Sequence, residues 1–173
     1  MASKPKDRRQ RRTDPHRLAR VTLSEILGLL EAIDEAGGES TAAAVGQDVE
    51  EDVSRLGPIL DATEFLGLLT VDEGTLRITD LSRRILHAGV RERKAIFRSI
   101  VQDLPLFRLL LEKLRSVGRP LSRDEVVQAI GAAAGSHRAE DLVDALVFWG
   151  RYVELLRYDG NSEQLSLRTP AKA

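Results

Sequence analysis

The sequence predicts a mainly α-helical protein of the α+β class, built from two similar units in tandem. A Phe-x-Gly sequence follows an apolar stretch of helical spacing twice, at Phe65 and at Phe148, which lie 148 − 65 = 83 residues apart. After each copy, two short stretches alternate between apolar and polar residues around turn-forming residues, which is typical of a β-hairpin. Three helices closed by such a hairpin make a winged helix. We therefore expect two tandem winged-helix units, each of three helices plus a β-hairpin wing, joined by a helical link.

The charge distribution separates a basic tail from an acidic body. Residues 4–20 contain eight Lys or Arg and two Asp, so their net charge is 8 − 2 = +6, and the body from Val21 onward carries −1 − 6 = −7. The tail has no apolar periodicity, so we expect residues 1–20 to be disordered. A solvated tail is the simpler interpretation. The alternative is a weak phosphate-binding arm, whose candidate residues are Arg8, Arg9, Arg11 and Arg12.

The first unit is expected over residues 21–90. Thr22 and Glu25 have the spacing of a capping box, which starts a helix, and Gly37 with Gly38 allows it to end. Pro58 predicts a kink in the third helix, or a helix that begins late at this residue. The expected helices lie at about 23–36, 41–46, 50–66 and 81–87, and the expected strands at 68–71 and 76–78.

The second unit, with its linking helix, is expected over residues 91–168. The linking helix covers residues 91–104, and Pro105 starts the next helix, which Gly118 ends. Ser122 and Glu125 form a second capping box. The last helix is expected to end at Gly150 and to bury Trp149 on its apolar stripe. Strands follow at 155–158 and 164–167, and residues 169–173 are expected to fray.

The sequence offers no residues for catalysis, and we expect neither an enzyme nor a bound cofactor or metal. It contains no cysteine, so thiolate chemistry and disulfides are excluded. The three histidines lie far apart, without the spacing of a metal site, and no Gly-rich phosphate-binding loop of the G-x-x-x-x-G-K-[ST] type occurs. No apolar run reaches the length of a membrane span. We expect a cytoplasmic protein that does not insert into a membrane.

The third helices carry the wrong charge for reading DNA. A winged helix that binds DNA places cationic and amide side chains of its third helix in the major groove. Residues 48–64 contain one Arg and six acidic residues, a net charge of 1 − 6 = −5, and residues 137–151 carry a net charge of −1. We therefore expect the body not to bind nucleic acid, and any weak affinity to reside in the tail.

From about Val21 to Leu167, the sequence resembles the AAA-associated C-terminal domain family, found mostly behind the ATPase subunits of nitrate/sulfonate/taurine-type ABC transporters. The similar segments are residues 24–38, 60–80, 91–101 and 145–167. The most specific is Trp-Gly-Arg-Tyr at 149–152, with Glu154 and Tyr158 after it. The resemblance implies an accessory, regulatory or interaction domain without catalytic residues. The ATPase domain that normally precedes it does not occur in this sequence, and the basic tail stands in its place.

The sequence thus predicts a non-enzymatic protein-interaction or regulatory module. Its candidate interaction residues are Arg151, Tyr152, Glu154 and Tyr158. Core packing and interface contact remain open alternatives for Tyr152. The expected partner is a protein such as an ABC transporter ATPase subunit, with a homodimer as a further option. The alternative function is a winged-helix nucleic-acid-binding regulator that uses the basic tail.

Overall fold

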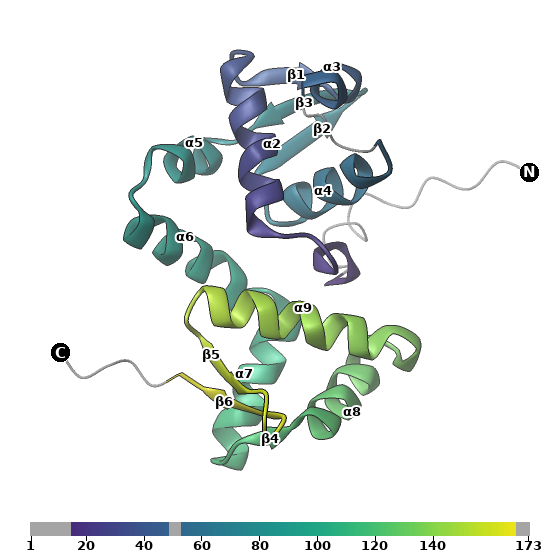
Figure 1. Ribbon diagram of the computed structural model, residues 1–173, viewed down its shortest axis with the longest axis vertical. Coiled ribbons are helices and arrows are strands. Elements are labelled where there is room, and N and C mark those ends of the chain that lie inside the picture. The colour runs from purple at the N-terminus through teal and green to yellow at the C-terminus, as the bar shows by residue number, and fades with distance from the viewer. Residues whose placement is uncertain (1–14, 49–52, 169–173) are drawn as a thin grey trace, which may run out of the picture. The chain divides into compact units, whose positions relative to one another are not determined.

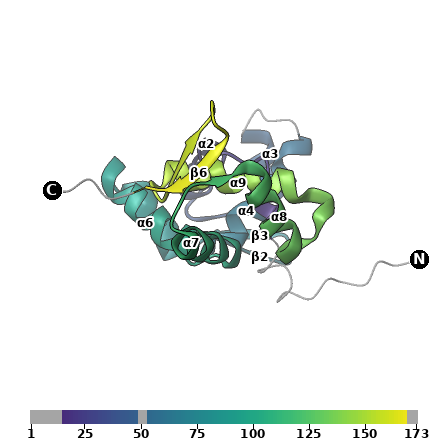
Figure 2. The same ribbon diagram turned by 90° about the horizontal axis from the view of Figure 1, so that it is seen from below.

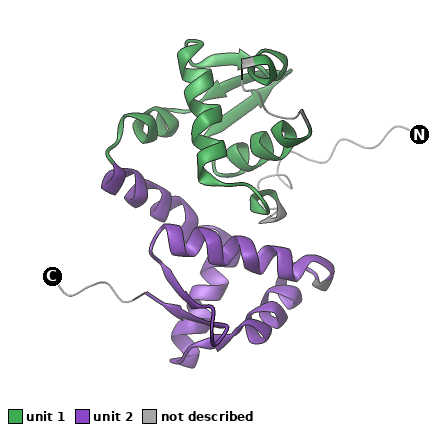
Figure 3. Ribbon diagram, in the orientation of Figure 1, with its two compact units in different colours: residues 1–89 green, residues 90–173 purple. Residues whose placement is uncertain are grey.

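The computed structural model describes residues 15–48 and 53–168, which are mainly helical with two small antiparallel sheets (Figure 1). They divide into two compact units between Gly89 and Val90 (Figure 3). This division lies one residue from the expected boundary. The tail arginines Arg8, Arg9, Arg11 and Arg12 and the expected frayed end, residues 169–173, lie outside the described residues.

The first unit packs its helices around one three-stranded sheet. Its elements are η1 (Pro15–Leu18), α2 (Leu23–Glu35), β1 (Glu39–Thr41), α3 (Ala42–Asp48), α4 (Val53–Phe65), β2 (Leu69–Asp72), β3 (Thr75–Ile78) and α5 (Asp80–His87). The sheet has the order β1-β3-β2, with Leu76 of β3 opposite both Ser40 and Val71. Helix α2 lies against α4, α5 and β3, and its Ile26, Leu30 and Ile33 are fully buried.

The second unit repeats this arrangement after one additional helix. Its elements are α6 (Val90–Gln102), α7 (Pro105–Val117), β4 (Leu121–Ser122), α8 (Arg123–Ala134), η2 (Ser136–Arg138), α9 (Ala139–Tyr152), β5 (Leu156–Asp159) and β6 (Gln164–Leu167). The sheet order is β4-β6-β5. The hairpin lies against α9 through β5 and against α7 through β6 (Figure 2). Both sheets therefore place the last strand of the unit in the middle.

Both predicted capping boxes are present. The Thr22 backbone N–H donates to Glu25 Oε2 at 2.7 Å, and the Glu25 N–H donates to Thr22 Oγ1 at 3.3 Å. At the start of α8, the Ser122 N–H donates to Glu125 Oε2 at 2.8 Å, and the Glu125 N–H donates to Ser122 Oγ at 3.3 Å. Each pair satisfies two helix N–H groups that would otherwise lack a partner inside the helix.

The second capping box gives the fold a defined dependence on acid. The hydrogen bond from Arg119 and the backbone N–H of Ser122 lower the pKa of Glu125 from 4.5 to about 2. Because this pKa is lower in the folded chain than in the unfolded one, its contribution to stability is complete above about pH 4.5 and is lost as the pH falls toward 2. The melting temperature of the parent should fall more steeply across this window than that of Glu125→Gln, followed by circular dichroism. Parallel melting curves would contradict the expectation.

Residues 15–20 belong to the first unit, which corrects the expected tail boundary at residue 20. Leu18 is buried, and Arg17 Nη2 lies 2.9 Å from Asp61 Oδ1 and 2.7 Å from Glu64 Oε2 of α4. Arg55 donates a hydrogen bond of 3.1 Å to the Arg20 carbonyl. These contacts reach more than thirty residues along the chain, so local composition could not reveal them.

Helix α4 and the strands β1 and β4 also differ from the expectation. Helix α4 continues through Pro58, so the late start at that residue is wrong. Strands β1 and β4 were not predicted, because segments of three and two residues carry no readable alternation. The acidic residues at 50–52 lie outside the described residues, and the two acids of α4 itself, Asp61 and Glu64, pair with Arg17.

The internal repeat is present, but its register is not the one that the Phe-x-Gly letters suggest. Leu68 N–H donates to the Thr63 carbonyl, and Leu155 N–H donates to the Gly150 carbonyl. The ends of the third helices, α4 and α9, are therefore equivalent at an offset of 155 − 68 = 87 residues. Strands β2 and β5 also share one pattern of burial in this register. Gly150 consequently lies inside α9, which ends at Tyr152, and the predicted helix end at Gly150 is wrong.

Candidate functional site

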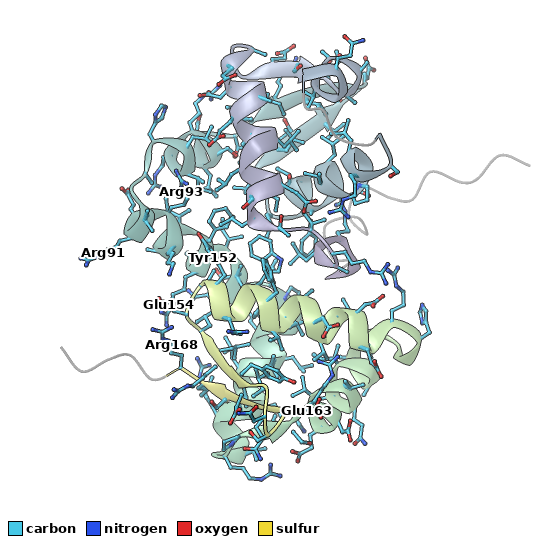
Figure 4. The ribbon with its side chains drawn as sticks, viewed as in Figure 1. Arg91, Arg93, Tyr152, Glu154, Glu163 and Arg168 are labelled. Carbon is cyan, nitrogen blue, oxygen red and sulfur yellow. The ribbon has the colours of Figure 1, made fainter. Side chains whose placement is uncertain are left out.

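An open groove of about 1010 Å³ lies between the last turns of α9 and the hairpin of the second unit. Three of the four predicted interaction residues, Arg151, Tyr152 and Tyr158, line it. The fourth, Glu154, lies at its edge beside Arg168, as Figure 4 shows. The complete lining is Phe148, Arg151, Tyr152, Leu156, Arg157, Tyr158, Ser166, Leu167 and Arg168. The structure thus brings the predicted residues together, while their role in binding stays a prediction.

The groove is positively charged. Arg151, Arg157 and Arg168 are all exposed, and no acidic residue is part of the lining. Within residues 15–48 and 53–168, neither Arg151 nor Arg157 forms a salt bridge. Arg168 lies 3.7 Å from Glu154, which it shares with Lys94 at 3.3 Å. Two guanidinium groups are therefore available to an incoming anion without breaking an ion pair.

Glu154 occupies the position of a glycine in the first unit. Its φ is +60°, whereas the equivalent Gly67 has a φ of +75°. A side chain in this left-handed region costs about 1–2 kcal/mol, because the Cβ approaches the carbonyl oxygen. The carboxylate gains the contacts to Lys94 and Arg168, and these lower its pKa, with the Lys94 hydrogen bond as the main cause. A strained residue that holds two cations is a feature to expect at a functional position.

Replacing Glu154 separates its backbone strain from its ion pairs. Glu154→Gly relieves the strain and loses the exposed ion pairs, which solvent screens and which therefore contribute little. Glu154→Gln loses the ion pairs and keeps the strain. Glu154→Gly should therefore melt at a higher temperature than Glu154→Gln in thermal denaturation. If Glu154→Gln melts higher, strain at this residue does not limit the stability of the turn.

An aromatic cluster supports the floor of the site. The Trp149 ring lies 6.1 Å from Phe97, 5.7 Å from Phe148 and 6.5 Å from Tyr152, between ring centroids. Trp149 is fully buried, which confirms the prediction for this residue. Edge-to-face arrangements of this kind add to the packing energy. The cluster fixes the end of α9, from which the groove residues project.

Tyr152 serves the core and the groove together. Its ring packs edge-on against Phe97 at 6.3 Å, and it also lines the groove. Lys94 Nζ lies 5.8 Å from its ring centroid, within the range of a cation–π contact. Burial raises the pKa of Tyr152, so the hydroxyl stays a neutral hydrogen-bond donor at neutral pH. The ring thus packs in the core and also faces the groove, and its contact with a partner stays a prediction.

Sequence reasoning missed Phe148 and the two additional arginines. Phe148 was assigned to the helix end, yet its side chain is 44% exposed. Arg157 lies in β5 and Arg168 directly follows β6, so nothing local in the sequence indicates that they converge. The outward position of Arg157 in the predicted strand alternation could have identified it, because Leu156 before it faces the core.

Within residues 15–48 and 53–168, no cluster of three or more His, Cys, Asp or Glu side chains is arranged to hold a metal ion. In the same part of the chain, no helix has the length and apolarity needed to cross a membrane.

Comparison with known proteins identifies the family. The family model described as the C-terminal AAA-associated domain matches residues 43–159. This match extends from α3 to the end of β5, so it includes the third helix of each unit and half of the groove-forming hairpin. No curated protein and no solved structure matches the chain. The match covers more than half of the sequence and agrees with the resemblance noted above, and the chain belongs to the family of C-terminal AAA-associated domains.

Proposed function

We propose that the protein is a non-enzymatic interaction module of two winged-helix units, and that the groove of the second unit is its docking site for a protein partner. The winged-helix assignment is supported by the element order helix, strand, helix, helix, strand, strand, which occurs in both units. The central place of the last strand in each sheet supports it as well. On this assignment, the hairpin that forms one wall of the groove is the wing.

The family relation supports an ABC transporter ATPase subunit as the partner. Domains of this family stand mostly behind such subunits, so a related domain is suited to contact the same kind of protein. A cytoplasmic location follows from this proposal, because transporter ATPase subunits act on that side of the membrane. The module would regulate the partner by binding, since the proposal assigns it no chemistry of its own.

The observation that carries the proposal is the convergence of Arg151, Tyr152 and Tyr158 with Phe148 in one groove. Arginine and large aromatic residues dominate the energetics of protein interfaces. The groove combines an apolar surface with two guanidinium groups, those of Arg151 and Arg157, that form no salt bridge among the described residues. Such a surface can bury an apolar anchor and pair its charged neighbours at the same time.

Nucleic acid is the less suitable occupant. Glu140 at the start of α9, and Asp159 and Glu163 in the hairpin, are exposed acidic groups on the elements that form the groove. A duplex would bring its phosphates near these carboxylates, and each such approach is repulsive. A short segment of a protein can contact the arginines and avoid the acids.

The proposal is tested by capture from a nuclease-treated cell extract. The full chain is immobilised, and the recovery of transporter ATPase subunits is compared between the parent and Arg157→Glu, a reversal of charge inside the groove. Arg115→Glu is the matched control, because Arg115 is an exposed arginine of α7 in the same unit and does not line the groove.

Recovery of an ATPase subunit should fall with Arg157→Glu and persist with Arg115→Glu. Equal recovery by all three proteins would exclude the groove as the docking site. Retention of nucleic acid from an untreated extract, with loss of every protein after nuclease treatment, would support the nucleic-acid regulator in its place.

A further inference from the structure

The last turns of α9, which line the groove, have an equivalent in the first unit: the last turns of α4. There, a short segment of the chain packs against them. In that unit, η1 packs on the outer side of α4, where Arg17 pairs with Asp61 and Glu64. The side chain of Arg17 is only 8% exposed in this contact, and Leu18 beside it is 5% exposed. A short segment that joins one charged and one apolar side chain thus packs against the last turns of the third helix, where Glu64 is 27% exposed and Asp61 stays exposed.

The equivalent surface of the second unit carries side chains of different charge and polarity. At the offset of 87 residues, Asp61 corresponds to Phe148 and Glu64 corresponds to Arg151. Two carboxylates are replaced by an apolar ring and a guanidinium group. Phe148 is 44% exposed, and Arg151 has no salt bridge within the described part of the chain. The contrast is clearest at Arg151, because Arg17 holds the equivalent Glu64, whereas α6 lies against α9 and leaves Arg151 exposed among the described residues.

We propose that the groove binds a short acidic segment of a partner protein, in which a glutamate or aspartate stands next to a leucine-like residue. This inference rests on the proposed function and specifies the chemistry of its ligand. The carboxylate takes the place that Arg17 has in the first unit and pairs with Arg151. The apolar side chain takes the place of Leu18 and covers Phe148. Arg157 and Arg168 pair with further acidic residues of the segment.

Charge and apolar contact are both required for this specificity. A carboxylate paired with an arginine gains from a charge-assisted and often bidentate hydrogen bond. The exposed Phe148 ring gains from losing contact with water. A segment with only one of these features should bind more weakly, and a segment with the basic charge of η1 should be repelled by the three arginines.

The test uses the chain's own covering segment as the probe. One dye-labelled peptide has the sequence of residues 15–20, and a second has the same sequence with Arg17→Glu and Arg20→Glu. Binding to the full chain is measured by fluorescence anisotropy. The charge-inverted peptide should bind at least roughly tenfold more tightly than the original, because two repelled charges become attracted ones, and a tenfold change corresponds to about 1.4 kcal/mol.

A reciprocal exchange in the protein gives the sharpest result. The double variant Phe148→Asp with Arg151→Glu recreates the first unit's residues at these two positions. Its affinity for the charge-inverted peptide should fall tenfold or more, and its affinity for the original peptide should rise. Arg115→Glu should change neither affinity by more than about twofold, because exposed charges outside contact range are screened. Circular dichroism melting confirms that each variant is folded.

Three outcomes would overturn the inference. Equal binding of the two peptides would show that the groove does not discriminate between ligands by their charge. Undiminished binding of a charge-inverted peptide that also carries Leu18→Ser would show that it responds to charge alone. Tighter binding of an oligothymidine, with displacement of the peptide, would indicate a nucleic-acid site.

The peptide experiment tests the ligand chemistry, and the capture experiment tests the proposed function, so each can fail without the other. If neither peptide binds while Arg157→Glu still abolishes capture of an ATPase subunit, the proposed function stands and the ligand chemistry inferred here is wrong. If the charge-inverted peptide binds but no ATPase subunit is captured, the ligand chemistry stands and the proposed partner is wrong.

Discussion

Trp149→Ala is expected to lower the free energy of unfolding of the second unit by about 3–5 kcal/mol. The indole is fully buried and contacts the rings of Phe97, Phe148 and Tyr152. Its removal leaves a cavity where the last turn of α9 meets α6, and the neighbouring rings cannot fill it without leaving their own contacts. Chemical denaturation followed by circular dichroism measures the loss. A change below about 0.5 kcal/mol, the range of ordinary surface substitutions, would contradict the packing described here.

Trp149→Phe is the matched control for this prediction. The indole Nε1 is buried without a hydrogen-bond acceptor among the described residues, and an unsatisfied buried donor costs about 1–3 kcal/mol. Phenylalanine removes this group and keeps an aromatic ring in the cluster. Trp149→Phe should therefore lose less than half of the stability that Trp149→Ala loses. Equal losses would indicate that the indole N–H has a partner in the folded protein.

Gly150→Ala is expected to destabilise the second unit by about 1–3 kcal/mol, as overpacking does in a filled core. A Cβ at this position would overlap Leu156 Cδ1 and lie 2.7 Å from its Cγ and 3.1 Å from its Cβ. Leu156 is the first residue of β5 and is itself buried, so it has little room to move. Thermal denaturation should show a lower melting temperature.

Gly28→Ala provides the opposite expectation for the same substitution. Gly28 lies inside α2, and a Cβ there would meet no heavy atom within 4 Å. Alanine favours a helix over glycine by about 0.8–1.0 kcal/mol, so this variant should be more stable than the parent. If both alanine variants are more stable than the parent, helix propensity outweighs the contact between Gly150 and Leu156, and if both are less stable, the expectation for Gly28 is wrong.

The sequence is sufficient for most helices and for both hairpins of this fold. Capping boxes at Thr22 and Ser122 and apolar spacing are local signals, and the helices they predict are present. The short strands β1 and β4 depend on pairing with β3 and β6, which lie far along the chain. A strand of two or three residues has no periodicity of its own, so only the folded partner strand defines it.

The register of the repeat explains why the second Phe-x-Gly pattern gave a wrong helix end at Gly150. Gly67 has a left-handed backbone, and a second Phe-x-Gly suggested the same role for Gly150. Gly150 is instead required for the close approach of Leu156 to a helix, and Glu154 adopts the left-handed conformation. Glycine serves two different physical purposes at the two sites. Its identity alone does not reveal which one applies.

The candidate site was predictable in part. Tyr152, Arg151 and Tyr158 were selected because they follow Trp149 in the most specific segment, and the folded hairpin returns Tyr158 to the end of α9. The opposite wall, with Arg168, could not be foreseen, because it depends on how β6 pairs with β5. The pairing of Arg17 with α4 was equally hidden, since it joins residues more than forty positions apart.

The uneven placement of the aromatic residues gives each unit a different optical signal. Trp149, Tyr152 and Tyr158 are the tryptophan and tyrosines of the whole sequence, and all three belong to the second unit. Fluorescence excited at the red edge of the indole band therefore reports on that unit alone, while far-ultraviolet circular dichroism reports on the helices of both. Coincident transitions by the two probes would mean that the units unfold together, and separate transitions would give each unit its own stability without dividing the chain.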